Sequence, residues 1–355
     1  MVDIKISADE LNDPAIDEII NLEKSLQRNE GQFVDDIPTP LYLNPVFYYA
    51  VASFLGAFLV WAISEPFYSD QDDHGIAFIS DYLLFGPVAG MIGLAIGLTY
   101  GITNRNYRKM YYCSVVGVGV GLGASLLTTF LAEFLFGVTS AMAAYLAHDT
   151  VPVPGDDFPF KGVAFFILMC GRGMAWSLVS VGAGLGLGIA LKSKKLILNG
   201  IAGGMVGGLL GGLLFDPICR FISESSDEAA LSRGIGIAAI GILVGFFIGV
   251  FENVSKDSWF LMLKGPLTGK QFVLYKSPMD IGSAPKCDIY LFKDPLIDPK
   301  HVQVLKSGSK YLIHDQDSEH GTFVNGNKIN KYILQEGDVV TIGETVLKYH
   351  ERERR

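Results

Sequence analysis

Long apolar runs separated by short polar loops fill residues 45–251 of the chain. Because a helix needs about 20 apolar residues to cross a bilayer, this pattern predicts six transmembrane helices. We expect them at 45–64, 80–102, 110–134, 165–191, 196–215 and 233–251. The run from Met110 to Ala147 is too long for one span. Its tail, 137–147, is expected to lie at the membrane interface or to extend the helix, and a re-entrant segment is a third alternative.

Short segments of alternating apolar and polar residues follow the last span. They cover 259–265, 270–276, 301–307, 310–316, 337–343 and 345–351, with turn residues between them. The pattern predicts an all-β sandwich of about 90 residues. Asn325-Gly326 is typical of a tight hairpin turn, in which both central residues need a positive φ.

The expected organisation is therefore a membrane α-helical bundle plus a C-terminal all-β sandwich. We expect an acidic N-terminal segment over 1–44, the transmembrane domain over 45–251, a linker over 252–257 and the β module over 258–351. Within the N-terminal segment, Asp13 and Pro14 suit the start of a short amphipathic helix. This helix could pack on the protein itself, be disordered or dock a partner protein.

Composition supports a membrane protein, since half of the residues are hydrophobic and only 18% are charged. Much of the net charge of −9 comes from the acid-rich first 40 residues, so nucleic acid is not an expected partner. The four cysteines have no metal-ligand spacing, which argues against zinc and against a disulfide framework. We expect free thiols and no metal or other cofactor.

The loops predict the orientation, because short cytoplasmic loops are enriched in Lys and Arg. Loops 104–109 and 192–195 are basic, whereas those near 64–75, 148–160 and 216–232 are acid-rich. Both termini are therefore expected in the cytoplasm of a multi-pass protein of the plasma or inner membrane. The N-terminus has no basic region followed by a short apolar core, so we expect no cleaved signal peptide.

The spans repeat weakly as three helical hairpins. Segments starting at Arg172 and Arg233 match at an Arg-Gly start and at two pairs of glycines, Gly184 with Gly245 and Gly188 with Gly249. The first helix of two hairpins is expected to end in an acid-Pro pair, Glu65-Pro66 and Asp216-Pro217.

Charged residues form a predicted layer at the outer boundary of the bundle. Counted from the basic loops at about 1.5 Å per residue, they lie roughly 30 to 36 Å away. Arg172 and Arg233 are expected to bridge carboxylates of neighbouring helices. An entrance for ions or protons is the alternative. The layer comprises Glu65, Asp81, Glu133, Arg172, Asp216 and Arg233.

Glycines recur every four residues in the last two spans, in the pattern of a glycine zipper. A helix face without side chains lets two backbones approach closely, which favours a tight bundle or a homo-oligomer over a wide pore. A gate of sliding helices is the alternative. The stripes comprise Gly200, Gly204, Gly208 and Gly212 in one span and Gly241, Gly245 and Gly249 in the other.

Residues Ser258 to Tyr349 resemble a forkhead-associated (FHA) domain. The resemblance rests on Ile281-Gly282 before a loop, on His301 at the start of a strand, and on the segments GTFVNGNKI and LQEGDVVTIG. It implies a β-sandwich whose loops at one end bind phosphothreonine peptides. It also implies architectural roles for Gly282, His301, Gly321, Thr322, Asn325 and Gly326.

The residues that bind phosphate in this family are replaced. Ser283 stands where the family has an arginine, and Asp298 stands where it has a serine that donates to the phosphate. Glu319-His320 replaces a Thr-Asn pair that holds the peptide backbone. Two carboxylates would repel a dianionic phosphate, so the site is expected to bind a protein partner without phosphate.

Basic residues in these loops keep the opposite hypothesis open. Lys286, Lys300 and a protonated His320 could restore positive charge, so that the loops bind phosphopeptides after all. The partner-binding candidates are therefore Ser283, Lys286, Asp298, Lys300, Glu319 and His320.

The sequence contains none of the common nucleotide-binding or hydrolytic motifs, so we do not expect an enzyme. Our leading hypothesis is a membrane-anchored interaction or signalling scaffold with an unknown cytoplasmic protein partner. The protein is expected to form a homo-oligomer or to be a subunit of a membrane complex. The alternatives are a small channel or transporter regulated through the β module, and a true phosphothreonine-peptide receptor.

Overall fold

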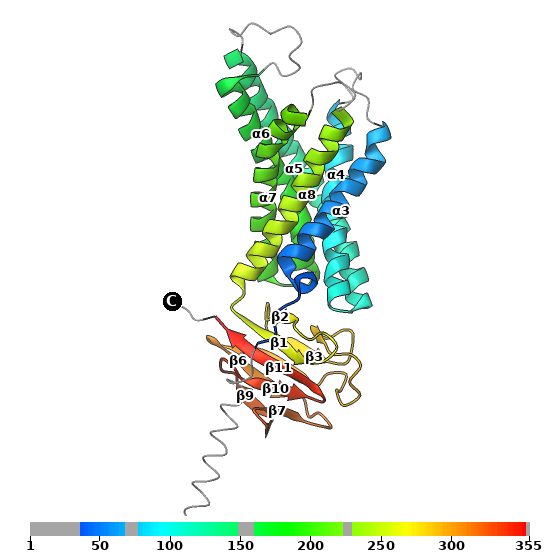
Figure 1. Ribbon diagram of the computed structural model, residues 1–355, viewed down its shortest axis with the longest axis vertical. Coiled ribbons are helices and arrows are strands. Elements are labelled where there is room, and N and C mark those ends of the chain that lie inside the picture. The colour runs from blue at the N-terminus through cyan, green and yellow to red at the C-terminus, as the bar shows by residue number, and fades with distance from the viewer. Residues whose placement is uncertain (1–35, 68–76, 148–159, 223–228, 353–355) are drawn as a thin grey trace, which may run out of the picture. The chain divides into compact units, whose positions relative to one another are not determined.

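The computed structural model describes residues 36–67, 77–147, 160–222 and 229–352, which form two compact units (Figure 1). One unit runs from Leu41 to Lys256 and is helical. The other combines residues 36–40 with residues 257–352 and is built from strands. The amphipathic helix predicted near Asp13 lies outside the described residues.

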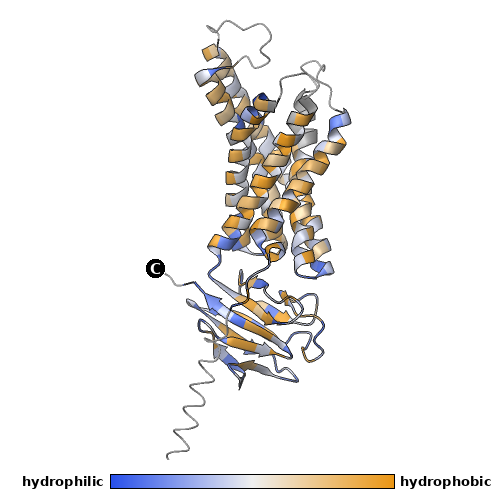
Figure 2. Ribbon diagram, in the orientation of Figure 1, coloured by the Kyte–Doolittle hydropathy of each residue, from blue (hydrophilic) through white to orange (hydrophobic). Residues whose placement is uncertain are grey.

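Six helices within the described residues are long and apolar enough to cross a membrane. Figure 2 shows apolar residues along all of them. Asn44 starts the first helix by accepting a hydrogen bond from the N–H of Val46 at 3.0 Å. The helices are α3 (Pro45–Ser64), α4 (Ala77–Thr103), α5 (Tyr107–Ala147), α6 (Gly162–Ala190), α7 (Lys194–Ile222) and α8 (Ala229–Ser255).

Two helix ends decide between or correct the predictions. Helix α5 continues to Ala147, which confirms the alternative that the tail of the long apolar run extends the helix. Helix α7 does not end at Asp216-Pro217 but continues through Pro217 to Ile222. A proline inside a helix removes only one backbone hydrogen bond, and packing of the rest of the helix can outweigh that loss. Helix α3 does end at Ser64, before the short 3-10 helix η2 (Glu65–Phe67).

The six helices form a closed ring. Each helix packs against its neighbours in the sequence, and α8 also packs against α3. A smaller contact joins α4 to α6. The described part of the helical unit therefore has no open edge between its first and last helices.

Glycine contacts recur where each predicted hairpin meets the next. A Cβ added to Gly97 of α4 would lie 2.5 Å from the backbone N of Ser114 of α5. One added to Gly184 of α6 would overlap the backbone of Gly200 of α7, and one added to Gly245 of α8 would overlap the backbone of Tyr49 of α3. All three places join the second helix of one hairpin to the first helix of the next.

Helix α7 presents glycines to both of its neighbours. One stripe faces α6 and consists of Gly200, Gly204, Gly208 and Gly212. The second stripe faces α8 and consists of Gly203, Gly207 and Gly211. The stripe of α8, Gly241, Gly245 and Gly249, faces α3. These glycines therefore serve packing within one chain.

The second unit is a sandwich of two sheets. The six-stranded sheet has the order β2-β1-β11-β10-β7-β8, and the five-stranded sheet has the order β4-β3-β5-β6-β9. Neighbouring strands in both sheets pair antiparallel, except β3 and β4, which are parallel. The strands are β1 (Ser258–Lys264), β2 (Gln271–Val273), β3 (Met279–Gly282), β4 (Ile289–Tyr290), β5 (Val302–Ser307), β6 (Lys310–Asp315), β7 (Thr322–Val324), β8 (Asn327–Ile329), β9 (Lys331–Ile333), β10 (Val339–Ile342) and β11 (Thr345–Glu351).

Apolar side chains from both sheets fill the space between them. Phe260, Ile281, Val302 and Leu347 are fully or almost fully buried there. Tyr349 packs against Phe260, and burial raises the pKa of its hydroxyl well above the ordinary value. This shared core fixes the strand ends from which the loops emerge.

Residues 36–40 pack on the sandwich, although more than 200 residues separate them from its first strand in the sequence. Asp36 forms an ion pair with Lys348 of β11 at 2.9 Å, and Gln271 of β2 donates to the hydroxyl of Thr39 at 3.1 Å. Gly269 leaves room for Pro40, whose Cδ would lie 2.9 Å from an added Cβ. The segment before the first helix thus contacts the same sheet as the end of the chain.

We predict that Gly200→Leu destabilises the helical unit, whereas Gly119→Leu does not. An added side chain at Gly200 meets the backbone of Gly184, which cannot move aside cheaply, and such overpacking costs about 1–3 kcal/mol. Nothing lies within 4 Å of a Cβ at Gly119 on α5, and the gain in helix propensity is the same for both changes. Thermal unfolding of the purified protein in detergent measures the difference. Equal midpoints would show that the close crossing of α6 and α7 is not required.

Candidate functional site

Loops at one end of the sandwich are tied together by backbone contacts. Strand β3 ends at Gly282, where a Cβ would lie 2.5 Å from the carbonyl oxygen of Pro299. The N–H of Ser283 donates to the carbonyl of Asp298 at 3.0 Å, and the N–H of Ala284 donates to that of Pro299 at 3.2 Å. The β3–β4 and β4–β5 loops therefore pack directly on each other, which is why position 282 requires glycine.

His301 joins the β4–β5 loop to the β6–β7 loop. Its ring is fully buried, and Nδ1 accepts a hydrogen bond from the N–H of Asp298 at 3.1 Å. Nε2 lies 3.3 Å from the carbonyl oxygen of Gly321. Because Nδ1 is the acceptor, a neutral ring carries its proton on Nε2 and donates it to Gly321. The ring therefore braces the loops and does not face a ligand.

Asp298 makes a second link between the same loops. Its carboxylate accepts a hydrogen bond from the N–H of Glu319 at 2.9 Å. The carboxylate thus uses a backbone donor at the position where the resemblance places a phosphate-binding hydroxyl. Sequence reasoning identified Asp298 as a substitution but missed this bond, because residues 298 and 319 are distant in sequence.

The β6–β7 loop has its own internal support. Asp315 accepts hydrogen bonds from the N–H and hydroxyl of Ser318, at 3.0 and 2.7 Å, and from the hydroxyl of Thr322 at 3.3 Å. Thr322 was among the architectural residues that the resemblance implied, but Asp315 was not. An acid three residues before a serine at the end of a strand is a local turn signal that could have identified it.

The hairpin between β7 and β8 has the conformation that its sequence predicts. Asn325 and Gly326 have φ values of 49° and 79°, as a tight turn with two left-handed residues requires. The side chain of Asn325 donates to Asp338 at 2.8 Å and accepts from the N–H of Val339 at 2.9 Å. The turn is thereby fixed to β10.

The charged side chains of these loops are of both signs. Lys286, Glu319 and His320 are exposed, and Ser283 is half-buried. Lys300 is partly neutralised by an ion pair with Asp280 at 3.1 Å. Side chains of both charge signs are therefore exposed on the same set of loops.

The predicted charge layer of the helical unit is only partly described. Arg172 of α6 pairs with Asp216 of α7 through Nε, at 2.9 and 3.0 Å from the two carboxylate oxygens. Glu65 begins η2, and Glu133 lies on α5 facing a cavity. Asp81 and Arg233 fall on α4 and α8, but their side chains lie outside the described part of the chain.

We predict that His301→Ala destabilises the sandwich by about 2–4 kcal/mol, because it leaves a cavity and removes the partners of the Asp298 N–H and the Gly321 carbonyl. Lys286→Ala changes an exposed side chain and should stay within about 0.5 kcal/mol of the wild type. Urea unfolding of the C-terminal module compares the two variants. A stable His301→Ala module would contradict the bracing role.

Comparison with known proteins identifies the sandwich. The FHA domain family model matches residues 279–343. The oxoglutarate dehydrogenase inhibitor of Corynebacterium jeikeium is 32% identical over 94 residues, which are 26% of this chain and 65% of that protein. The glycogen accumulation regulator GarA of Mycolicibacterium smegmatis is 31% identical over 94 residues, which are 26% of this chain and 59% of that protein. The chain thus spans less than two thirds of the length of these relatives.

Solved structures with a similar fold include two further FHA domains. One, from a Chlamydia trachomatis protein, is 26% identical and covers 28% of this chain and 100% of its own, with a TM-score of 0.26. The other, from an Arabidopsis thaliana protein, is 27% identical and covers 29% of this chain and 91% of its own, with a TM-score of 0.26. The predicted resemblance is confirmed: the C-terminal part of this chain contains an FHA domain, a protein–protein interaction module.

Proposed function

We propose that this protein is a multi-pass membrane protein that displays its FHA domain in the cytoplasm and binds a partner protein without needing phosphate. The hydrogen bond from the Glu319 N–H to the Asp298 carboxylate is the observation that carries this proposal. It places a negative charge of the domain itself between the two loops that would otherwise surround a phosphate.

Electrostatics supports this reading of the loops. A phosphothreonine brings a charge of about −1.5 to −2 and needs cationic or hydroxyl donors. Here Asp298 already accepts from the opposite loop, Glu319 adds a second carboxylate, and Lys300 is paired with Asp280. A ligand phosphate would have to approach two acids and displace a hydrogen bond, so an uncharged or basic peptide segment is the better partner.

The relatives support a regulatory role. Two of the curated proteins with similar sequences are named as an oxoglutarate dehydrogenase inhibitor and as a glycogen accumulation regulator. By analogy, we propose that this protein acts by binding rather than by catalysis. A partner held near the membrane would be a subunit of the same complex, either a cytoplasmic protein or a further copy of this chain.

The proposed orientation follows from the loop charges. Basic residues gather where α4 meets α5, at Asn104–Lys109, and where α6 meets α7, at Lys192–Lys195. Both loops are therefore assigned to the cytoplasm. An even number of spans then returns the chain to the cytoplasm after α8, where the FHA domain begins.

We predict that phosphothreonine peptides bind the FHA domain no better than their unphosphorylated forms. The measurement is a titration of fluorescent peptide libraries against the C-terminal module, followed by isothermal calorimetry of any hit. A phosphate-dependent interaction with a micromolar dissociation constant would contradict the proposal and favour a phosphopeptide receptor.

A matched variant tests the reason for this result. Replacing the four altered positions by the family residues, as Ser283→Arg, Asp298→Ser, Glu319→Thr and His320→Asn, should create phosphate-dependent binding in the same assay. The variant supplies a guanidinium and hydroxyl groups in place of two carboxylates. Gain of binding in a folded variant shows that these four residues, and not the rest of the fold, exclude phosphate.

We predict that Lys161→Cys is labelled by a membrane-impermeant thiol reagent added to whole cells, whereas Lys194→Cys is labelled only after the membrane is opened. Both side chains are exposed at the start of a helix, α6 and α7, and the proposed orientation places them on opposite sides of the bilayer. The experiment uses a background without the four native cysteines. The reverse labelling pattern would place the FHA domain outside the cytoplasm.

A further inference from the structure

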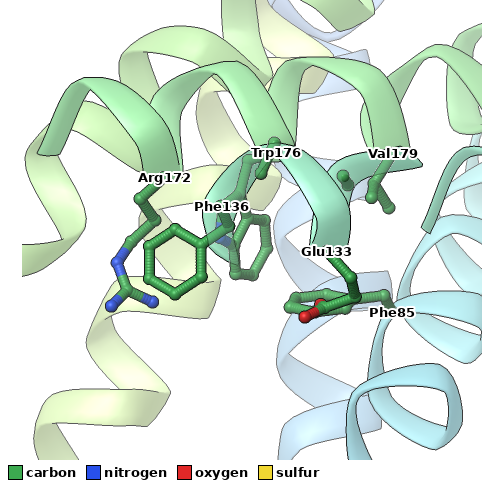
Figure 3. Close-up of a pocket in the computed structure, with 8 residues that line it drawn as sticks. Phe85, Glu133, Phe136, Arg172, Trp176 and Val179 are labelled. Carbon is green, nitrogen blue, oxygen red and sulfur yellow. The ribbon is translucent and has the colours of Figure 1, made fainter. Parts of the chain in front are cut away.

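A cavity of about 110 Å³ lies between α4, α5 and α6 (Figure 3). Aromatic rings of Phe85, Phe136 and Trp176 line it, and Glu133 and Arg172 bring opposite charges to it. In Figure 3 the two charged groups lie on opposite sides of the rings of Phe136 and Trp176. The cavity therefore has a cationic end, an anionic end and aromatic walls between them.

The cationic end retains hydrogen-bonding capacity. The guanidinium of Arg172 lies 4.8 Å from the ring centre of Phe136 and 5.1 Å from that of Phe215, and its Nε binds Asp216. Among the described residues, none accepts a hydrogen bond from the terminal Nη groups. Their four N–H donors match the oxygens of a phosphate, to which arginine can bind in a bidentate manner. The side chain is 24% exposed, so an external group can reach it.

The opposite end suits an ammonium group. The Glu133 carboxylate has about four lone-pair positions, so it can accept from a ligand in addition to its contacts within the protein. Phe85 and Trp176 pack edge to face, with ring centres 4.6 Å apart, beside it. Aromatic faces attract a desolvated cation, and a nearby carboxylate strengthens that attraction.

The size and surroundings of the cavity favour the headgroup of a lipid. A volume of about 110 Å³ exceeds the roughly 10–15 Å³ that a single water needs on this measure, which leaves room for an aminoethyl group. Phe130 and Phe134 of α5, on either side of Glu133 in the sequence, are 66% and 67% exposed, as acyl-chain contacts would be. Arg172 and Glu133 lie about 30 to 36 Å along their helices from the basic loops, which is the depth of the opposite headgroup layer.

We propose that this cavity binds a zwitterionic aminophosphate group, with the ammonium at Glu133 and the aromatic rings and the phosphate at the Nη groups of Arg172. Phosphatidylethanolamine is the lipid that carries this chemistry, and free phosphoethanolamine is the soluble source of the same group. This inference rests on the membrane insertion that the proposed function assumes, but it does not depend on the FHA domain.

The test uses the full chain purified from membranes in a non-ionic detergent. Three probes are titrated: a short-chain phosphatidylethanolamine, a short-chain phosphatidylglycerol, which has phosphate without ammonium, and phosphoethanolamine. Binding is followed by native mass spectrometry and by the shift of the thermal midpoint. The ethanolamine lipid should bind and stabilise the wild-type protein, and the glycerol lipid should bind at least about tenfold more weakly, the factor that corresponds to 1.4 kcal/mol.

Two variants assign the binding to the two ends of the cavity. Glu133→Gln keeps the size of the side chain but removes the charge. It should weaken the binding of phosphatidylethanolamine about tenfold without changing the binding of phosphatidylglycerol. Arg172→Lys keeps the charge beside Asp216 but removes the paired Nη donors. It should weaken the binding of both lipids. Glu65→Gln, an acid of η2 that is not among the residues lining the cavity, is the matched control and should bind as the wild type does.

Phosphoethanolamine separates the two sources of the ligand. If phosphatidylethanolamine and phosphoethanolamine both bind, the site is supported and a soluble zwitterion is a sufficient ligand. If phosphatidylethanolamine binds and phosphoethanolamine does not, the ligand is the headgroup of an intact lipid. Equal binding of the two lipids, or unchanged binding in folded Glu133→Gln, would overturn the proposal. A lack of membrane insertion appears separately in the thiol-labelling experiment, and phosphate-dependent peptide binding bears only on the FHA domain.

Discussion

Direct contact between helix backbones is the constraint on which the helical unit depends. In the bilayer that we propose for this unit, apolar side chains would gain little by leaving lipid for one another, so close packing and polar contacts would hold the helices together. Gly184 and Gly200 bring α6 and α7 together at the backbone, and Gly245 does the same for α8 against Tyr49 of α3. Because the same contact recurs between successive hairpins, the ring closes. The cavity at Arg172 and Glu133 exists only where this packing leaves room.

The FHA domain depends on a different kind of contact. Its loops are fixed by hydrogen bonds between the side chains of His301 and Asp298 and nearby backbone groups: His301 accepts from the N–H of Asp298 and contacts the carbonyl of Gly321, and Asp298 accepts from the N–H of Glu319. The two contacts of the His301 ring hold these loops in the arrangement that the FHA resemblance implies. The bond from Glu319 to Asp298 occupies the space between the loops with an acid of the domain itself. The fold thus keeps the shape of an FHA domain, while the loss of phosphate binding remains our proposal.

The sequence predicted much of this architecture because its signals are local. Six long apolar runs, the Asn325-Gly326 turn and the alternating strands each act over fewer than about 25 residues. Strands β3, β4 and β9 were missed because their two to four residues are too few to show alternation and no longer alternating run surrounds them. The helix end at Pro217 was placed wrongly because packing of α7 outweighs a local signal for a helix end. Of the site residues, the family pattern identified His301 and Asp298, but it did not show what they contact.

The sequence by itself determined the features that short segments carry. These are the apolar length of each helix, the glycine spacing, the FHA motifs and the acids at positions 298 and 319. Tertiary structure alone decided which partners these residues meet. It brings Asp36 to Lys348, Asp298 to Glu319 and Arg172 to Asp216, pairs that are separated by many residues. It also assigns the glycine stripes to contacts within the chain. The physical reason is that such pairings depend on how whole helices and sheets pack, and no short segment encodes that packing.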